Sequence, residues 1–160
     1  GFSTRNVVLL YIFYNAVATL ASLPAGVIAD RIKPQYAYAI GLSAFGITYL
    51  LLGTSNNHLL AIIAIGIYGL FPAFTDGVGK SWIGKLSSKT ERGRSQGVYQ
   101  ASMNFAILGA GIWGGALWRK NDFELPLVMA GIGALIGVLL LLLRYSAITS
   151  STDETRRSIS

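Results

Sequence analysis

The stretch GVIADRIK, residues 26–33, lies between two long apolar runs and decides which class of fold the chain adopts. Its aspartate and arginine stand side by side where a membrane-spanning helix is expected to meet water. Ahead of them, Ala18, Ser22 and Gly26 recur at every fourth residue, which leaves one helix face almost bare of side chains. Such small-residue faces let helices approach closely inside a bilayer. The stretch therefore predicts a membrane protein with closely packed helices.

Composition supports a membrane protein and argues against several other classes. Hydrophobic residues make up 52% of the 160 residues and charged residues 12%, whereas soluble domains carry roughly 25% charged residues. The net charge is +6, but the basic residues lie in short loops between apolar runs, so no nucleic-acid partner is expected. The chain has no cysteine and a single histidine, His58. We therefore expect no metal site and no cofactor.

Five apolar runs are long enough to cross a bilayer, for which a helix needs roughly 20 residues. They cover residues 7–29, 36–54, 59–82, 95–118 and 125–143. We predict an all-α polytopic membrane protein with five transmembrane helices within residues 1–146, followed by a flexible tail at 147–160. Because Gly1 is not a start methionine and no signal peptide follows it, we expect the chain to be part of a longer protein.

The basic residues also predict how the runs are oriented. Of the 13 Lys and Arg residues, ten lie at one set of helix ends, among them the loop after Asp30 and the segment 85–94. The positive-inside rule assigns those loops, and with them the C-terminus, to the cytoplasm. We expect an integral protein of the plasma (inner) membrane with a cytoplasmic C-terminus.

The five runs differ in polarity, and this predicts their surroundings. The runs 36–54 and 125–143 contain no acidic, basic, amide or histidine side chain, whereas the other three do. Such groups are costly in hydrocarbon unless they face protein or a wet cavity. We therefore expect the runs 7–29, 59–82 and 95–118 to line a cavity, and the two apolar runs to face lipid.

Three short motifs together resemble the C-terminal half of a major facilitator superfamily transporter, from its eighth to its twelfth helix. They are Gly26-x-x-x-Asp30-Arg31 after the first run, Tyr68-Gly69 with Asp76-Gly77 in the third, and Arg92-Gly93-x-x-x-Gly97 at the start of the fourth. The order, the spacing and the side of the membrane agree with the family. One departure is that the later glycine and basic positions of the family's loop signature are Lys33, Pro34 and Gln35 here.

The resemblance implies a secondary active transporter that moves a small molecule by alternating access. Proton-coupled efflux is one form of such transport, but the sequence leaves the coupling ion and the direction open. The N-terminal half is the expected missing partner within the same lipid bilayer. A membrane scaffold without transport activity remains an alternative. A membrane-embedded transferase is disfavoured, because Asp76-Gly77 is followed by Lys80 and Ser81 instead of the Ala-Arg of phosphatidyltransferases, and no further aspartates follow in the next run. We expect no enzyme activity.

The charged residues near the cytoplasmic helix ends suggest a latch that closes a gate. Asp30 is expected to dock on the helix that begins near Ser95, where free N–H groups carry partial positive charge; simple anchoring at the interface remains an alternative. Asp76 and Lys80 are four residues apart and are expected to form an ion pair, while proton coupling by Asp76 stays open. The candidate latch consists of Gly26, Asp30, Arg31, Asp76, Lys80 and Arg94.

Uncharged polar residues within the runs are candidates for a substrate pathway. Hydrogen bonds between helices would explain them equally well. Pro72 is expected to kink the run 59–82. The candidate pathway residues are Tyr11, Asn15, Tyr68, Gln100 and Asn104. Glycines expected to allow close packing are Gly109, Gly111, Gly114, Gly115, Gly133 and Gly137.

Overall fold

The computed structural model describes residues 3–117 and 124–159, with side chains described up to Arg144. Within these ranges every regular element is a helix and none is a strand, which confirms the predicted all-α class. The helices are α1 (Thr4–Arg31), α2 (Pro34–Thr54), α3 (His58–Tyr68), α4 (Leu70–Leu86), α5 (Arg92–Leu117) and α6 (Glu124–Ile159).

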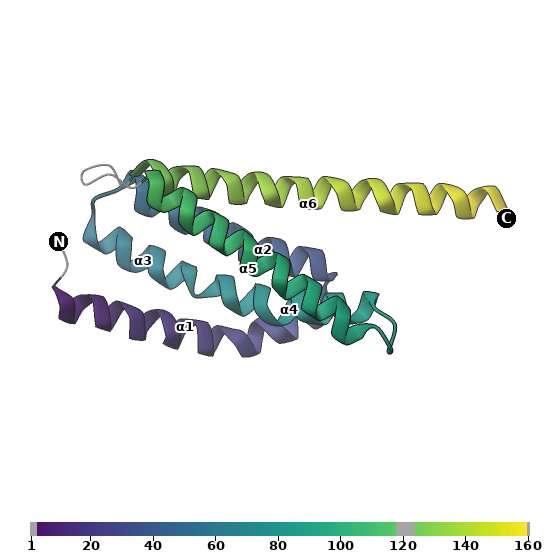
Figure 1. Ribbon diagram of the computed structural model, residues 1–160, viewed down its shortest axis with the longest axis horizontal. Coiled ribbons are helices and arrows are strands. Elements are labelled where there is room, and N and C mark those ends of the chain that lie inside the picture. Colours follow the sequence, from purple (N-terminus) through teal and green to yellow (C-terminus); the bar gives the residue numbers. More distant parts are fainter. Residues whose placement is uncertain (1–2, 118–123, 160) are drawn as a thin grey trace.

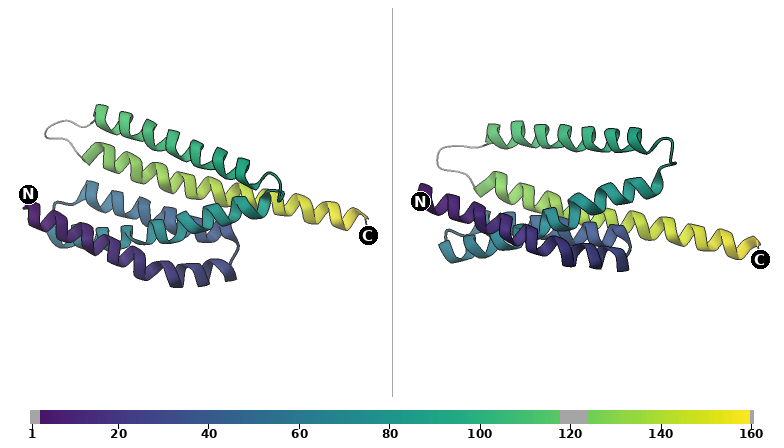
Figure 2. Two further views of the ribbon diagram at one scale, coloured as in Figure 1. Left: turned by 60° about the horizontal axis from the view of Figure 1, so that its bottom comes forward. Right: turned by 90° about the horizontal axis from the view of Figure 1, so that it is seen from below.

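The helices lie side by side along one common direction, and successive long helices run in opposite senses (Figure 1). The α1–α2 turn and the α4–α5 turn lie at the same end, and α6 projects beyond the other helices from that end (Figures 1 and 2). The sequence predicts a flexible tail at 147–160, whereas α6 continues as helix through Ile159. The segment 145–159 contains neither glycine nor proline, so no helix-breaking residue ends α6 there.

Among the described residues, four stretches are long and apolar enough to cross a membrane, judged by length and composition. They are Thr4–Arg31, Pro34–Thr54, His58–Leu86 and Glu124–Arg144. The fifth expected span forms α5, whose 26 residues extend about 39 Å at 1.5 Å per residue. Because α5 carries basic and amide side chains, it is less apolar than the other four stretches. The last residue of the expected span, Trp118, lies outside the described residues. The chain is thus an integral membrane protein with four clearly apolar spans.

The expected kink in the third span is present as a break between α3 and α4 at Gly69. Pro72 has no N–H group to donate to the carbonyl of Tyr68, four residues earlier. The backbone forms a tighter turn at this point, and the Gly69 amide donates hydrogen bonds to the carbonyls of Ile65 and Gly66 at 3.3 and 3.2 Å. The membrane stretch His58–Leu86 therefore consists of two helical segments.

Helix α2 lies at the centre of the helix group and packs on α3, α4 and α6. Its buried face consists mainly of alanine and glycine, with Thr48 donating its hydroxyl to the Ala64 carbonyl of α3 at 3.0 Å. Its other face exposes large side chains, among them Ile40 and Ile47. The sequence predicts that this helix faces lipid, but only one of its faces is open. Small side chains let α2 pack closely among its neighbours, with Thr48 as a buried polar contact.

An aromatic cluster joins four helices. Tyr68 lies at its middle, with its ring centroid 5.3 Å from that of Tyr14 and 5.8 Å from that of Phe71. Phe45 and Tyr49 of α2 stack at 4.1 Å and complete the contact with α3 and α4. Aromatic pairs at such distances add roughly 0.5–1.5 kcal/mol beyond the area they bury. The cluster therefore holds α1, α2, α3 and α4 together.

Helix α5 packs less closely, since none of its residues is buried among those described. It contacts α4 through its first half, where the Gln96 amide donates to the Lys80 carbonyl. Tyr99 lies directly over Gly79, and the ring of Tyr38 of α2 lies beside the same glycine. Figure 2 shows α5 lying apart from α1. The contact at Gly79 thus joins α5 to both α4 and α2.

Gly79→Ala is expected to destabilise this junction, because the new Cβ would overlap the hydroxyl and ring of Tyr99. Overpacking of this kind costs about 1–3 kcal/mol, against a gain of at most about 1 kcal/mol from helix propensity. The melting temperature in detergent should fall. Gly77→Ala is the matched control, because nothing lies within 4 Å of its added Cβ. If Tyr99 is the cause, Tyr99→Ala in the same molecule should recover part of the loss.

Candidate functional site

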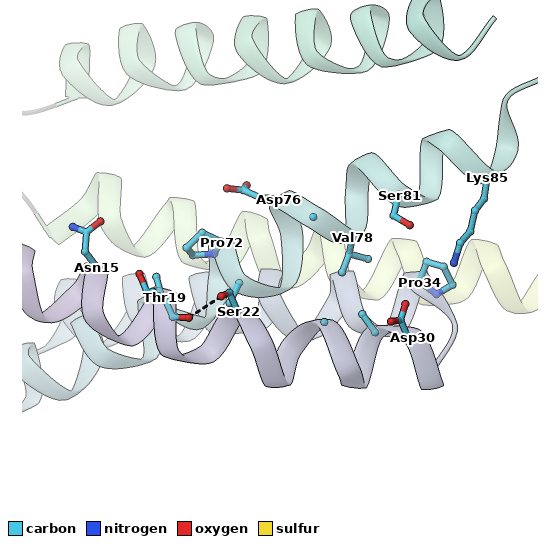
Figure 3. Close-up of a pocket in the computed structure, with 15 residues that line it drawn as sticks. Asn15, Thr19, Ser22, Asp30, Pro34, Pro72, Asp76, Val78, Ser81 and Lys85 are labelled. Atoms are coloured by element: carbon cyan, nitrogen blue, oxygen red, sulfur yellow. Dashed lines mark hydrogen bonds between the residues drawn. The ribbon is translucent and has the colours of Figure 1, made fainter. Parts of the chain in front are cut away.

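An open groove of about 550 Å³ runs between α1 and α4 (Figure 3). Its walls combine small residues with hydroxyl, amide and charged side chains, which is an unusual lining for membrane-spanning helices. The small residues include Ala18, Gly26, Ala29, Ala73 and Gly77. The polar residues are Asn15, Thr19, Ser22, Asp30, Asp76, Ser81 and Lys85.

The groove exists because both helices present small residues at helical spacing. On α1 these include Ala18, Ser22 and Gly26; on α4 they include Ala73 and Gly77. A Cβ added at either groove glycine would meet nothing within 4 Å. The sequence predicts that the α1 stripe packs tightly against another helix. Within the described residues the stripe instead lines the groove, while the neighbouring residue Ala25 is buried in the core.

Charge is distributed unevenly along the groove. Asp30 and Lys85 lie opposite each other at one end of the groove. Asp76 comes earlier in α4 than Lys85 and lies on the side of the groove nearer to Asn15 (Figure 3). The described side chains form no ion pair between Asp76 and Lys80, contrary to the sequence-based expectation. Asp76 lines the groove, whereas Lys80 does not. A spacing of four residues permits a contact between two side chains but does not require one.

The uncharged polar residues of α1 bond to their own helix. The Asn15 amide donates to the Tyr11 carbonyl at 2.8 Å, and the Ser22 hydroxyl donates to the Thr19 carbonyl at 2.7 Å. These bonds reduce the cost of holding polar groups in an apolar environment. They leave the carbonyl oxygen of the Asn15 amide group as an acceptor on the groove wall.

The structure brings together four of the predicted site residues, Asn15, Gly26, Asp30 and Asp76. It separates the others from this groove. In the described ranges α1 and α5 make no contact, so Asp30 does not reach the start of α5. Gln100 and Asn104 are exposed on α5, and Arg94 lines a second pocket between α4 and α5. Arg31 is exposed at the end of α1, and Tyr11 and Tyr68 belong to the aromatic cluster.

Sequence reasoning missed two groove residues, Ser81 and Lys85, and treated the lysine only as a loop charge. A signal was present in the sequence, because Ala73, Gly77, Ser81 and Lys85 follow one another at intervals of four along α4. This spacing places them on one helix face. Among the described residues no group of three or more histidine, cysteine, aspartate or glutamate side chains is arranged to hold a metal ion.

Comparison with known proteins gives a family for this arrangement of helices. The model of the Major Facilitator Superfamily matches residues 1–159. An uncharacterized MFS-type transporter of Methanocaldococcus jannaschii is 29% identical over 133 residues, which cover 83% of this chain and 33% of the relative. A second one from the same organism is 24% identical, over 91% of this chain and 37% of the relative.

A probable vesicular acetylcholine transporter-A of Danio rerio is 27% identical, over 81% of this chain and 25% of the relative. The chain thus spans about a third or less of the length of these relatives. The family match nevertheless extends over almost every residue, including both walls of the groove. The chain belongs to the Major Facilitator Superfamily.

Proposed function

We propose that the chain forms the C-terminal half, helices eight to twelve, of a secondary active transporter that moves a small molecule by alternating access. The observation that carries this proposal is the open polar groove between two membrane-spanning helices. The relatives support it, because they are transporters about three times as long as the matched region. The remaining helices of the full-length protein would supply the other half of the pathway.

In this mechanism the groove between α1 and α4 carries the solute, and its charged end forms a gate. Asp30 and Lys85 face each other there and would attract one another when α1 and α4 close. Asp76 lies deeper in the groove, within about two turns of the break at Gly69. A break inside a membrane helix gives the two segments some freedom to tilt, which alternating access requires.

The gate proposed here differs in its members from the latch that the sequence predicts. Lys85 takes the place of Lys80, because it lines the groove. Arg94 could join Asp30 only if α5 moved toward α1. Coupling to protons through residues other than Asp76, an efflux direction and a plasma-membrane location with a cytoplasmic C-terminus are further parts of the proposal. The location and orientation are supported by the basic residues at one set of helix ends. No catalytic chemistry is part of the proposal.

Asp30→Asn in the full-length protein tests the gate. Loss of the charge removes the attraction to Lys85, and the ratio of uptake to efflux rates should change about tenfold, in line with coupling energies of about 1–3 kcal/mol between such sites. The measurement uses vesicles and a panel of labelled solutes. Acetylcholine is included because the relative from Danio rerio is named as a probable vesicular acetylcholine transporter.

The control for this experiment is Glu124→Gln, which makes the same isosteric change at the start of α6, outside the groove. An Asp30→Asn protein with unchanged rates and an unchanged uptake-to-efflux ratio would rule out the gate. If no solute of the panel moves while a partner protein still binds after Asn15→Leu and Asp76→Ala, the chain is a scaffold instead of a transporter.

A further inference from the structure

A second pocket, of about 570 Å³, lies between the end of α4 and the start of α5. Its walls are of two kinds. Ile83, Leu86 and Val98 provide an apolar surface, while Glu91, Arg94 and Ser95 provide a polar rim. The pocket is separate from the groove between α1 and α4, with which it shares no lining residue.

Arg94 is the basic residue that lines this pocket, and the turn that leads up to it carries an excess of positive charge. The segment 85–94 contains Lys85, Lys89, Arg92 and Arg94 against a single acidic residue, Glu91. All five side chains are exposed, and the Glu91 carboxylate accepts a hydrogen bond from the Ser88 hydroxyl at 3.2 Å. Four positive charges and one negative charge leave a local net charge of +3. An anionic group would be attracted to this rim.

The apolar walls continue directly from the charged rim into the membrane-spanning part. The membrane stretch His58–Leu86 ends at the rim, so the basic segment is expected to lie at the level of the lipid headgroups. Leu86 and Val98 are 73% and 61% exposed. Side chains of this kind would lie against hydrocarbon in a bilayer. A soluble anion would neutralise the rim but would leave these walls uncovered.

We propose that this pocket binds an anionic phospholipid. Its phosphate would lie at Arg94, with Lys89 and Arg92 adding positive charge from the same turn, and an acyl chain would lie along Ile83, Leu86 and Val98. Basic pockets at the ends of membrane helices attract anionic headgroups, with each Lys or Arg contributing about 1 kcal/mol near the surface. The lipid would bridge α4 and α5 at the turn where α5 makes its contact with α4. This site does not depend on the proposed transport function.

The test measures how strongly the purified full-length protein retains phosphatidylglycerol relative to phosphatidylcholine, by native mass spectrometry and by melting temperature in lipid nanodiscs. The rim variant combines Arg94→Gln in the pocket with Lys89→Gln on the adjoining turn, and loss of the two charges should weaken retention of phosphatidylglycerol about tenfold or more. The matched control removes two exposed charges outside the pocket, with Arg5→Gln and Arg144→Gln. Retention by this control should stay close to that of the original protein.

A third variant, Val98→Asn, keeps the rim charges but makes the wall polar. Its retention of phosphatidylglycerol should also fall, because the acyl chain loses an apolar contact. Equal losses in the rim variant and in the charge control would overturn the proposal, because they would indicate general attraction to the membrane surface. Stabilisation by inorganic phosphate equal to that by phosphatidylglycerol would overturn it as well, since the site would then take a free anion.

Discussion

Asp76→Asn is expected to slow transport by the full-length protein about tenfold or more, while the dependence of transport on the pH gradient persists. Asp76 is exposed and lines the groove, and no described basic side chain forms an ion pair with it. In the proposed mechanism its charge acts on the solute in the groove and on Lys85 at the groove's end. Loss of about 1.4 kcal/mol of such an interaction in the rate-limiting step slows the rate tenfold.

The experiment compares uptake and efflux in vesicles at several pH gradients for the original protein, Asp76→Asn and Glu124→Gln. The last variant removes a carboxylate from the first turn of α6, outside the groove, and should transport normally. A slower rate with intact pH coupling supports a gating role for Asp76. Loss of pH coupling with substrate binding retained would contradict this expectation and would make Asp76 the residue that carries the coupled proton.

Gly131→Leu is expected to have the largest effect on stability and to prevent folding, whereas the smaller Gly131→Ala change should still give folded protein. An added Cβ at Gly131 would lie 2.8 Å from Leu50 Cγ and 2.9 Å from the backbone carbonyl oxygen of Gly46. A side chain could rotate away, but that carbonyl belongs to α2 and moves only with the helix. Overpacking costs about 1–3 kcal/mol where neighbours can shift, and more where they cannot.

Gly133→Leu is the matched control, because it lies two residues further along the same helix and nothing lies within 4 Å of its added Cβ. Melting temperature and elution profile in detergent are measured for both positions. Gly131→Ala should lower the melting temperature by several degrees, as expected for about 1–3 kcal/mol, while Gly133→Leu should leave it nearly unchanged. Equal effects at the two positions would mean that the α2–α6 contact is not as close as described.

Helical spacing accounts for the candidate site residues that lie together, while their roles stay predictions. Asn15, Gly26 and Asp30 lie in one groove with Asp76, as expected for polar and small residues on facing sides of two membrane helices. Gln100 and Asn104 have the same character but lie on α5, which makes no contact with α1 in the described ranges. The polarity of a helix indicates that it faces something other than lipid, but it does not identify the neighbour.

By itself, the sequence determines that the chain is a membrane protein made of helices, and it determines where the third span breaks. Both follow from local chemistry: long apolar runs need internally bonded backbone, and Pro72 cannot donate a hydrogen bond to Tyr68. Only the tertiary structure decides which glycines lie in close contacts between helices. Gly46 and Gly131 form the close contact, whereas Gly109, Gly115 and Gly133 face open space. A glycine permits close approach on any side, and what approaches it depends on the positions of the other helices.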